Sequence, residues 1–406
     1  MLSDGERMLG GLLRASHTAT LEDVVPLVAQ HAGYAGFTNT QIYVADLQSE
    51  FLVPLPGQVD AAGEPLSRLR VDGTVAGRAF RDITLVRAPL NKADDPDAVR
   101  LWTPLLDGTE RVGVVGAITH RSDETTEWRM KRLGTLLSLM VVSKRHSSDT
   151  YAQLVRTEPM TLSAEVLWNL LPNGSFANDK VVLGGALEPA YQVGGDAFDY
   201  GITGDLLHLT ILDAMGHDLT SGLTATIATG ACRNSRLQGV DLLTTSEAID
   251  EAIADQFRQT RFATGILADL NMTTGELTWV NRGHHPPLVI RDGRLAATLE
   301  SKVPSPPMGF RLGTSSGIER YQLHRGDRLL FYTDGIVEAQ SPEGEMFGLD
   351  RFIEFIVRHE AYGMSAPETL RRLIQSILRH QHGRLQDDAT VLTVEWQAGR
   401  HVALMM

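Results

Sequence analysis

The pattern of apolar and polar positions divides the chain into short strand-like runs and longer helix-like stretches. Short apolar runs bounded by glycine or polar turn residues predict buried strands at 181–186 and 209–212. Apolar residues that recur every three or four positions predict helices at 20–32, 219–237 and 246–259. The chain is therefore expected to contain both helices and strands.

The first part of the chain, residues 1–122, is expected to form a separate unit. A helix at 20–32 is followed by predicted strands, at 41–44, 51–55, 84–88, 101–106 and 111–119. This order, with the segment Asp72-Gly73-Thr74-Val75-Ala76-Gly77-Arg78-Ala79-Phe80, resembles a GAF domain, which is a sensing module. The resemblance implies that an unknown small ligand or a partner binds this GAF-like domain.

A helical connector is expected at 123–175. Its first helix carries apolar residues that approximate a heptad seam, among them Leu133, Leu136, Leu137 and Met140. Two interpretations are open: the helix packs on its own domain, or it pairs with a second copy of the chain. The second interpretation predicts a homodimer.

Composition and charge exclude several classes of protein. The chain has 406 residues, a net charge of −13 and one cysteine, Cys232, so it forms no internal disulfide and suits a reducing compartment. It has no run of 18 apolar residues and no signal-like start, which predicts a soluble, cytoplasmic protein without a membrane segment. The acidic balance argues against nucleic acid as a partner.

Two aspartates stand where predicted strands begin or end. Asp196 follows the glycine pair 194–195, and Asp213 follows the strand at 209–212. The composition of 203–205 favours a hairpin turn, which would bring both carboxylates to one end of the strand pair. Either aspartate alone is more simply explained as an ordinary turn residue.

Two further acidic positions have the same relation to strands. Asp334 follows the apolar run 329–332, and Asp387 and Asp388 precede the last predicted strand. Together these positions fit an all-oxygen site for a hard divalent cation, Mn²⁺ or Mg²⁺. The histidine pair at 284 and 285 is not expected to bind zinc, because no cysteine or suitably spaced second histidine completes a tetrahedral set.

Five motifs in order resemble the SpoIIE-type (RsbU-like) serine phosphatases of the metal-dependent PPM family. They are Val193-Gly194-Gly195-Asp196, Asp213 to His217, Asn281-Arg282-Gly283-His284-His285-Pro286-Pro287, Tyr332-Thr333-Asp334-Gly335-Ile336-Val337-Glu338 and Asp387-Asp388-Ala389-Thr390. The resemblance implies the α/β (α+β) fold class, with a PPM-type α-β-β-α sandwich over residues 176–398. It also implies a centre of two Mn²⁺ or Mg²⁺ ions at the ends of the sheets.

The same resemblance implies roles for single residues. Asp213 would bridge the two ions and the Ala214 carbonyl would bind one of them. Asp334 and Asp387 would complete the pair, and Asp196 would act directly or through water. The chain departs from the family at two positions where glycine is usual. These are Ala214, which follows Asp213, and Asp218, which follows His217.

The expected function is that of a phosphoserine/phosphothreonine protein phosphatase under control of the N-terminal sensor. The resemblance implies a phosphoprotein substrate of the anti-sigma factor antagonist type, and a regulatory route through the helices at 219–237 and 246–259. Two alternatives stay open. The departures at Ala214 and Asp218 suit a catalytically weak regulatory binding protein, and the two-metal chemistry suits a hydrolase of small phosphate esters.

Overall fold

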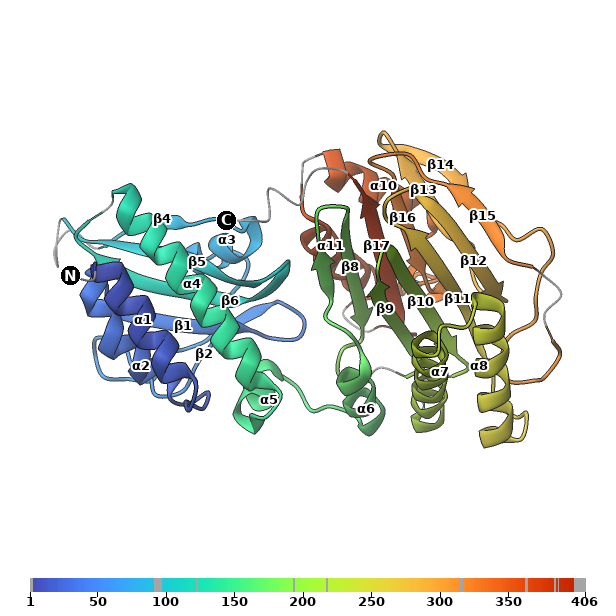
Figure 1. Cartoon of the computed structure of the whole chain (residues 1–406), viewed down its shortest axis with the longest axis horizontal. Coiled ribbons are helices and arrows are strands. Elements are labelled where there is room, and N and C mark those ends of the chain that lie inside the picture. Colours follow the sequence, from blue (N-terminus) through green and yellow to red (C-terminus); the bar gives the residue numbers. More distant parts are fainter. Residues whose placement is uncertain are drawn as a thin grey trace. The chain divides into compact units, whose positions relative to one another are not determined.

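A computed structural model describes residues 3–90, 97–121, 123–192, 194–216, 218–313, 317–361, 364–382, 385 and 387–397. The described residues fall into two compact units, and the boundary lies between Glu158 and Pro159 (Figure 1). Among the described helices, none is both long and apolar enough to cross a membrane.

The first unit is one antiparallel sheet covered by helices on both faces (Figure 1). Its strand order is β3-β2-β1-β6-β5-β4. Alternate side chains of β1 enter two different cores: Ile42 packs with helices α1, α2 and α4, and Tyr43 packs with α3. The elements are α1 (Asp4–Ser16), α2 (Val24–Ala32), η1 (Gly33–Ala35), β1 (Thr38–Ala45), β2 (Phe51–Pro54), β3 (Leu69–Arg70), α3 (Val75–Asp82), β4 (Val86–Pro89), β5 (Val99–Asp107), β6 (Glu110–Thr119), α4 (Glu124–Arg145) and α5 (Asp149–Val155).

The start of the chain differs from the expectation in two places. Helix α1 was not expected; it begins with a capping box, in which Ser3 and Glu6 satisfy each other's backbone amides. The predicted helix at 20–32 begins only at Val24, because Asp23 accepts hydrogen bonds from the amide and hydroxyl of Thr20 and closes a turn there. The GAF-like character of this unit stays a resemblance.

Helix α4 packs on its own unit. Asp123 caps it, and Leu133, Leu137 and Met140 are buried in the same core as α1 and α2. These three residues are therefore not available as an intersubunit seam, which corrects the structural basis of the homodimer prediction. An amphipathic stripe shows only that a helix face is buried, and here the chain's own sheet buries it.

The second unit contains two antiparallel sheets with helices on their outer faces (Figure 1). Strand order is β15-β12-β11-β10-β9 in one sheet and β14-β13-β16-β17-β8-β7 in the other. Helices α7 and α8 pack on the first sheet, and α10 and α11 pack on the second. This arrangement confirms the predicted α+β class and the α-β-β-α layering.

The elements of this unit are α6 (Leu162–Leu170), β7 (Ser175–Ala177), β8 (Val181–Glu188), β9 (Asp196–Thr203), β10 (Leu206–Ala214), α7 (Leu219–Leu237), α8 (Leu242–Phe257), β11 (Ala263–Asn271), β12 (Glu276–Arg282), β13 (Leu288–Arg291), β14 (Arg294–Thr298), β15 (Glu319–Gln322), β16 (Arg328–Tyr332), α9 (Asp334–Val337), α10 (Leu349–Ala361), α11 (Ala366–His380) and β17 (Ala389–Trp396).

The predicted hairpin at 203–205 is confirmed. Strands β9 and β10 pair antiparallel through this turn, where Gly204 has a φ of 59°. Glycine adopts this left-handed conformation without the steric cost of a side chain. The pairing continues without a bulge until Asp213 lies directly opposite Asp196, so the turn sets the register of both carboxylates.

The burial of α4 gives a prediction with an internal control. Leu137→Glu should destabilise the first unit by more than roughly 3 kcal/mol, because it places a charge in an apolar core. Leu139→Glu, on the same helix but 53% exposed, should change stability by less than about 1 kcal/mol. Thermal unfolding measures both. A folded Leu137→Glu protein that differs only in its oligomeric state would contradict this placement of the helix.

Candidate metal centre

Asp196 and Asp213 form the part of the site that comes from the five-stranded sheet. They pair across β9 and β10, and Asp213 is also opposite Thr264 of β11. The loop before β9 lies against the end of β10: a Cβ on Gly195 would stand 2.2 Å from the Ala214 carbonyl oxygen. Glycine is therefore required at position 195 because the two backbones approach too closely for any side chain.

Asp334 and Asp387 come from the six-stranded sheet. Asp334 begins the short helix α9 after β16, and Asp387 precedes β17. These two segments touch, because Thr333 donates its amide to the Thr390 carbonyl at 3.0 Å, and a Cβ on Gly335 would stand 1.9 Å from the Asp388 carbonyl oxygen. A cleft of about 200 Å³ lies beside them, lined by Asp334, Gly335, Glu338, Ala339, Gln340, Gln381 and Asp387.

The acidic groups of the two sheets lie close enough to affect one another. Burial, and then the negative charges of Asp334, Asp387 and Asp388, raise the pKa of Asp213 to about 7. Burial, and then the charges of Asp213 and Asp388, raise the pKa of Asp196 well above its usual range. The fold therefore brings together the four predicted aspartates, which stand far apart in the sequence.

This group of side chains fits a divalent cation. Its donors are carboxylate oxygens, which hard ions such as Mg²⁺ and Mn²⁺ prefer. Burial and mutual repulsion make the ionised forms of Asp196 and Asp213 costly, and a bound dication would relieve that cost. The ligand roles of Asp196, Asp213, Ala214, Asp334 and Asp387 remain predictions that this geometry supports.

Asp388 has a role that the sequence did not reveal. Its carboxylate oxygens accept hydrogen bonds from the backbone amides of Gly194 (2.7 Å), Gly195 (2.6 Å) and Asp196 (3.1 Å). Asp388 thereby fastens the start of β17 in one sheet to the start of β9 in the other. The neighbouring Asp387 is exposed and faces the cleft.

Thr333 holds the Asp196 carboxylate. Its hydroxyl donates to Asp196 Oδ2 at 2.7 Å and accepts from the Thr390 amide at 2.9 Å. This contact joins residues 137 positions apart in the chain. The orientation of Asp196 is thus fixed by the six-stranded sheet, although Asp196 belongs to the other one.

His284 also connects the two sheets. Its Nε2 atom lies 3.1 Å from the Tyr332 carbonyl oxygen, and its Nδ1 atom lies 2.9 Å from the Thr264 hydroxyl. Because a carbonyl only accepts, Nε2 carries the hydrogen and Nδ1 accepts from Thr264. Burial lowers the pKa of His284 to about 3, so the ring is neutral. The ring therefore bridges Thr264, which lies opposite Asp213, and Tyr332, which stands two residues before Asp334.

Comparison with known proteins agrees with this geometry. Residues 203–397 match the family model described as Stage II sporulation protein E (SpoIIE). This part of the chain is a SpoIIE-type domain. The match contains Asp213, Asp334 and Asp387, and Asp196 lies just before it.

Two curated proteins resemble longer parts of the chain. Protein IcfG of Synechocystis sp. (strain ATCC 27184 / PCC 6803 / Kazusa) is 23% identical over 326 residues, which are 72% of this chain and 51% of IcfG. The matched region thus spans about half the length of that relative. Phosphoserine phosphatase RsbU of Bacillus subtilis (strain 168) is 23% identical over 249 residues, which are 60% of this chain and 71% of RsbU.

Among solved structures, the RsbU and RsbW domains of Rv1364c from Mycobacterium tuberculosis resemble this chain with 24% identity and a TM-score of 0.47. The match covers 54% of this chain and 62% of that one.

The two departures of the SpoIIE-type domain from its family pattern have structural explanations. Ala214 ends an extended strand and is not among the residues with positive φ, so its methyl group meets no backbone restriction there. Asp218 caps α7, accepting a hydrogen bond from the Ser221 amide at 2.9 Å. His217 lies outside the described residues.

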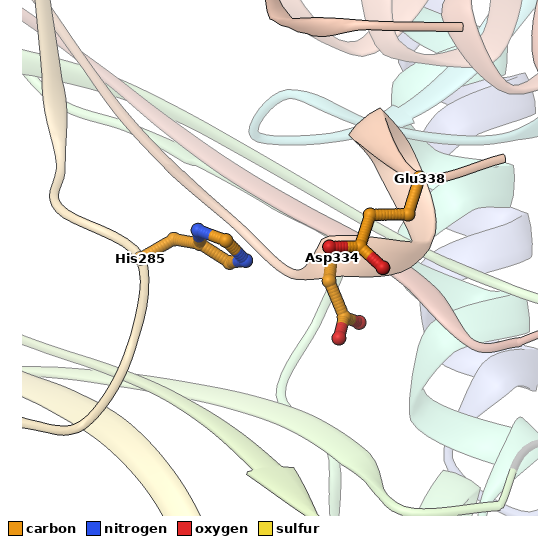
Figure 2. A group of neighbouring side chains, drawn as sticks. All are labelled: His285, Asp334 and Glu338. Carbon is orange, nitrogen blue, oxygen red and sulfur yellow. The ribbon is translucent and has the colours of Figure 1, made fainter. Parts of the chain in front are cut away.

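His285 and Glu338 are two more residues of the SpoIIE-type domain beside the aspartates. Figure 2 shows the His285 ring turned toward the carboxylates of Asp334 and Glu338. One ligand atom from each of the three residues lies within 4.8 Å of the others. The sequence did not predict this group, because His285 lies in a loop far along the chain from the helical turn that carries Asp334 and Glu338.

The raised pKa of Asp213 predicts how pH changes the stability of the metal-free protein. The folded state binds this proton more tightly than the unfolded chain, whose aspartates titrate near 3.9. The stabilising contribution is therefore complete below about pH 4 and is lost as the pH rises through about 7. In a chelator, Asp213→Asn should exceed the wild type in unfolding free energy by more than about 1 kcal/mol at pH 8.

The control for this prediction lies at the other end of the same hairpin. Asp205 is exposed, and Lys180 holds its pKa below the usual range, so Asp205→Asn should show no such gain. Chemical denaturation between pH 5 and pH 8 measures these differences. A constant difference between Asp213→Asn and the wild type over that range would contradict the raised pKa.

Substitutions of the two adjacent aspartates should have unequal effects on stability. Asp388→Ala leaves three backbone amides without their acceptor, so it should lower the unfolding free energy by about 2 kcal/mol or more. Asp387→Ala removes the acceptor of the Asp388 amide but also a charge that repels Asp213, so its effect should stay below about 1 kcal/mol. Equal losses in the two variants, measured by urea unfolding, would show that Asp388 is not the anchor.

Proposed function

We propose that the chain is a metal-dependent phosphoserine/phosphothreonine protein phosphatase. The observation that carries this proposal is that Asp196 and Asp213 of one sheet lie close to Asp334 and Asp387 of the other, and the latter two line a cleft. The SpoIIE-type domain and its similarity to a protein named phosphoserine phosphatase support the same reaction class.

The chain's own residues would hold two Mn²⁺ or Mg²⁺ ions. Asp213 would be the central ligand, since Asp334 and Asp387 from the opposite sheet lie close enough to raise its pKa. Asp334 and Asp387 would complete the set, with Asp196 and the Ala214 carbonyl beside them. Such an ion pair, when bound, supplies an activated water and neutralises the charge of the phosphoryl group.

The remaining residues position this set. Thr333 orients Asp196, Asp388 fastens the loop before it, and the neutral His284 ring holds the two sheets at a fixed separation. A displacement of about 1 Å in such an arrangement is costly for catalysis. These contacts would therefore keep the ligands in place before substrate arrives.

A cysteine nucleophile does not fit this site. Cys232 is 3% exposed in α7, its sulfur lies 3.4 Å from the Thr210 hydroxyl, and burial raises its pKa. A buried thiol with a raised pKa is inert as a nucleophile. The proposed hydrolysis therefore uses water.

Substitution of the aspartates tests the activity. Asp213→Asn and Asp334→Asn should each lower Mn²⁺-dependent hydrolysis of p-nitrophenyl phosphate more than about a hundredfold, because each removes a charged ligand at nearly constant volume. Asp205→Asn should retain wild-type turnover. Near-wild-type turnover of either ligand variant at saturating Mn²⁺ would show that the set is wrong.

The substrate class needs a separate measurement. We propose a phosphoprotein of the anti-sigma factor antagonist type, because RsbU is among the relatives. A phosphoserine protein should be hydrolysed with a higher kcat/KM than free nucleotides. The reverse preference would favour the alternative of a hydrolase for small phosphate esters. A metal-loaded wild type without measurable turnover would favour the regulatory binding protein.

Control by the first unit belongs to the same proposal. Helix α6 follows the unit boundary, and Arg233 of α7 donates to the Leu170 carbonyl at its end at 2.6 Å. Arg233 also pairs with the buried Asp199 of β9. A shift of α6 would therefore reach both α7, which begins near Asp213, and β9, which begins with Asp196.

Deletion of the first unit tests this regulation. A chain beginning at Pro159 should differ several-fold from the full-length chain in apparent Mn²⁺ affinity or turnover of p-nitrophenyl phosphate. Superimposable Mn²⁺ titrations would mean that the first unit does not control the centre. The sensor ligand, the homodimer and the cytoplasmic location stay predictions.

A further inference from the structure

A second group of potential metal ligands lies at the rim of the cleft. The group consists of His285, Asp334 and Glu338, with one ligand atom from each within 4.8 Å of the others (Figure 2). His285 and Asp334 are half-buried and Glu338 is exposed, so the group is accessible from solvent. Asp334 and Glu338 also line the 200 Å³ cleft, which provides a path for a small ion.

The two carboxylates are placed together by one helical turn. Glu338 stands four residues after Asp334 and donates its backbone amide to the Asp334 carbonyl oxygen at 2.7 Å. Residues four apart lie on the same face of a helix, so both side chains extend in the same direction. Of the two, Asp334 is half-buried and Glu338 is exposed to solvent.

The His285 ring is held on the other side of this group. It stacks on Tyr332 with a centroid distance of 5.6 Å and an interplanar angle of 18°. Its loop is closed by two reciprocal hydrogen bonds, from the His284 amide to Asn281 Oδ1 at 2.8 Å and from Asn281 Nδ2 to the His284 carbonyl at 2.9 Å. The imidazole is therefore fixed by its surroundings, as a ligand in a formed site is.

We propose that His285, Asp334 and Glu338 bind one borderline divalent transition-metal ion of the zinc class. One imidazole nitrogen and two carboxylate oxygens favour such an ion over Mg²⁺, which prefers oxygen ligands alone. Zinc–ligand distances of about 2.0–2.2 Å allow two ligand atoms to stand at most about 4.2 Å apart. The three ligand atoms lie within 4.8 Å of one another, so ion binding would require only a small adjustment of these side chains.

Occupancy of this site has a consequence for the hydrolytic centre. Asp334 is shared between the zinc-class site and the proposed pair of hard ions. A zinc-class ion would draw Asp334 toward His285 and compete with the ion that Asp334 would otherwise hold. The ion would therefore act as an inhibitor. This consequence rests on the proposed function, whereas the binding itself does not.

Calorimetry with Zn²⁺ tests the site on the full chain in excess Mg²⁺. The wild type should bind one Zn²⁺. His285→Gln and Glu338→Gln should each weaken Zn²⁺ binding at least about tenfold, because even the loss of a residue that only hydrogen-bonds to a metal ligand typically lowers metal affinity by this much. His324→Gln provides a matched control, because His324 is an exposed histidine of the same unit outside the cleft. That variant should bind Zn²⁺ like the wild type.

A spectroscopic readout identifies the nitrogen ligand without any enzyme assay. Cu²⁺ added to the Mg²⁺-loaded wild type should show nitrogen hyperfine coupling by electron paramagnetic resonance, and His285→Gln should lose it. Asp213→Asn separates this proposal from the proposed function, because it should lose hydrolysis and keep Zn²⁺ binding. Unchanged Zn²⁺ affinity in His285→Gln, or a wild-type Cu²⁺ spectrum without nitrogen coupling, overturns the proposal.

Discussion

Buried carboxylates that repel one another lie where the strand ends of the two sheets of the second unit come together. The rest of the unit has to hold these charges in place. Asp196 and Asp213 belong to one sheet, and Asp334, Asp387 and Asp388 border the other. Burial, and then the charges of Asp334, Asp387 and Asp388, raise the pKa of Asp213. Without a cation, the burial and mutual repulsion of Asp196 and Asp213 cost free energy of folding, and perturbed groups of this kind cluster at functional sites.

Neutral and hydrogen-bonded groups hold the edges together despite this repulsion. Backbone amides neutralise part of the Asp388 charge, the Thr333 hydroxyl donates to Asp196, and the His284 ring bridges Thr264 and Tyr332. Each contact crosses from one sheet to the other. The result is a set of ligands whose positions are fixed by the fold, which is the requirement for a site that tolerates little misplacement.

Local rules predicted the parts of this site that depend on local geometry. The turn at 203–205 and the uninterrupted pairing after it place Asp196 opposite Asp213, as the sequence indicated. The distinction between Asp387 and Asp388 could not be predicted, because neighbouring residues in an extended segment point to opposite sides and nothing local tells which side faces the loop. The Thr333–Asp196 contact spans 137 positions and has no local signal at all. The apolar stripe of α4 correctly predicted that one face of the helix is buried. It did not show what buries that face, and the structure has the helix packed on its own unit rather than on a second copy of the chain.

The histidine pair shows a similar limit. The spacing of cysteine and histidine residues argued against zinc at 284–285, and both ring nitrogens of His284 are indeed used in contacts with Thr264 and Tyr332. The fold nevertheless brings the carboxylates of Asp334 and Glu338, at the two ends of helix α9, close to His285. Ligand sets of mixed type assembled by tertiary structure leave no spacing signature in the sequence.

The central claim is that the four aspartates converge on divalent ions, and anomalous X-ray scattering from crystals grown with Mn²⁺ tests it most directly. The account predicts anomalous peaks within roughly 2.5 Å of carboxylate oxygens of Asp213, Asp334 and Asp387, with Asp213 nearest the centre. Peaks that lie elsewhere, or bound Mn²⁺ that does not touch Asp213, would contradict it.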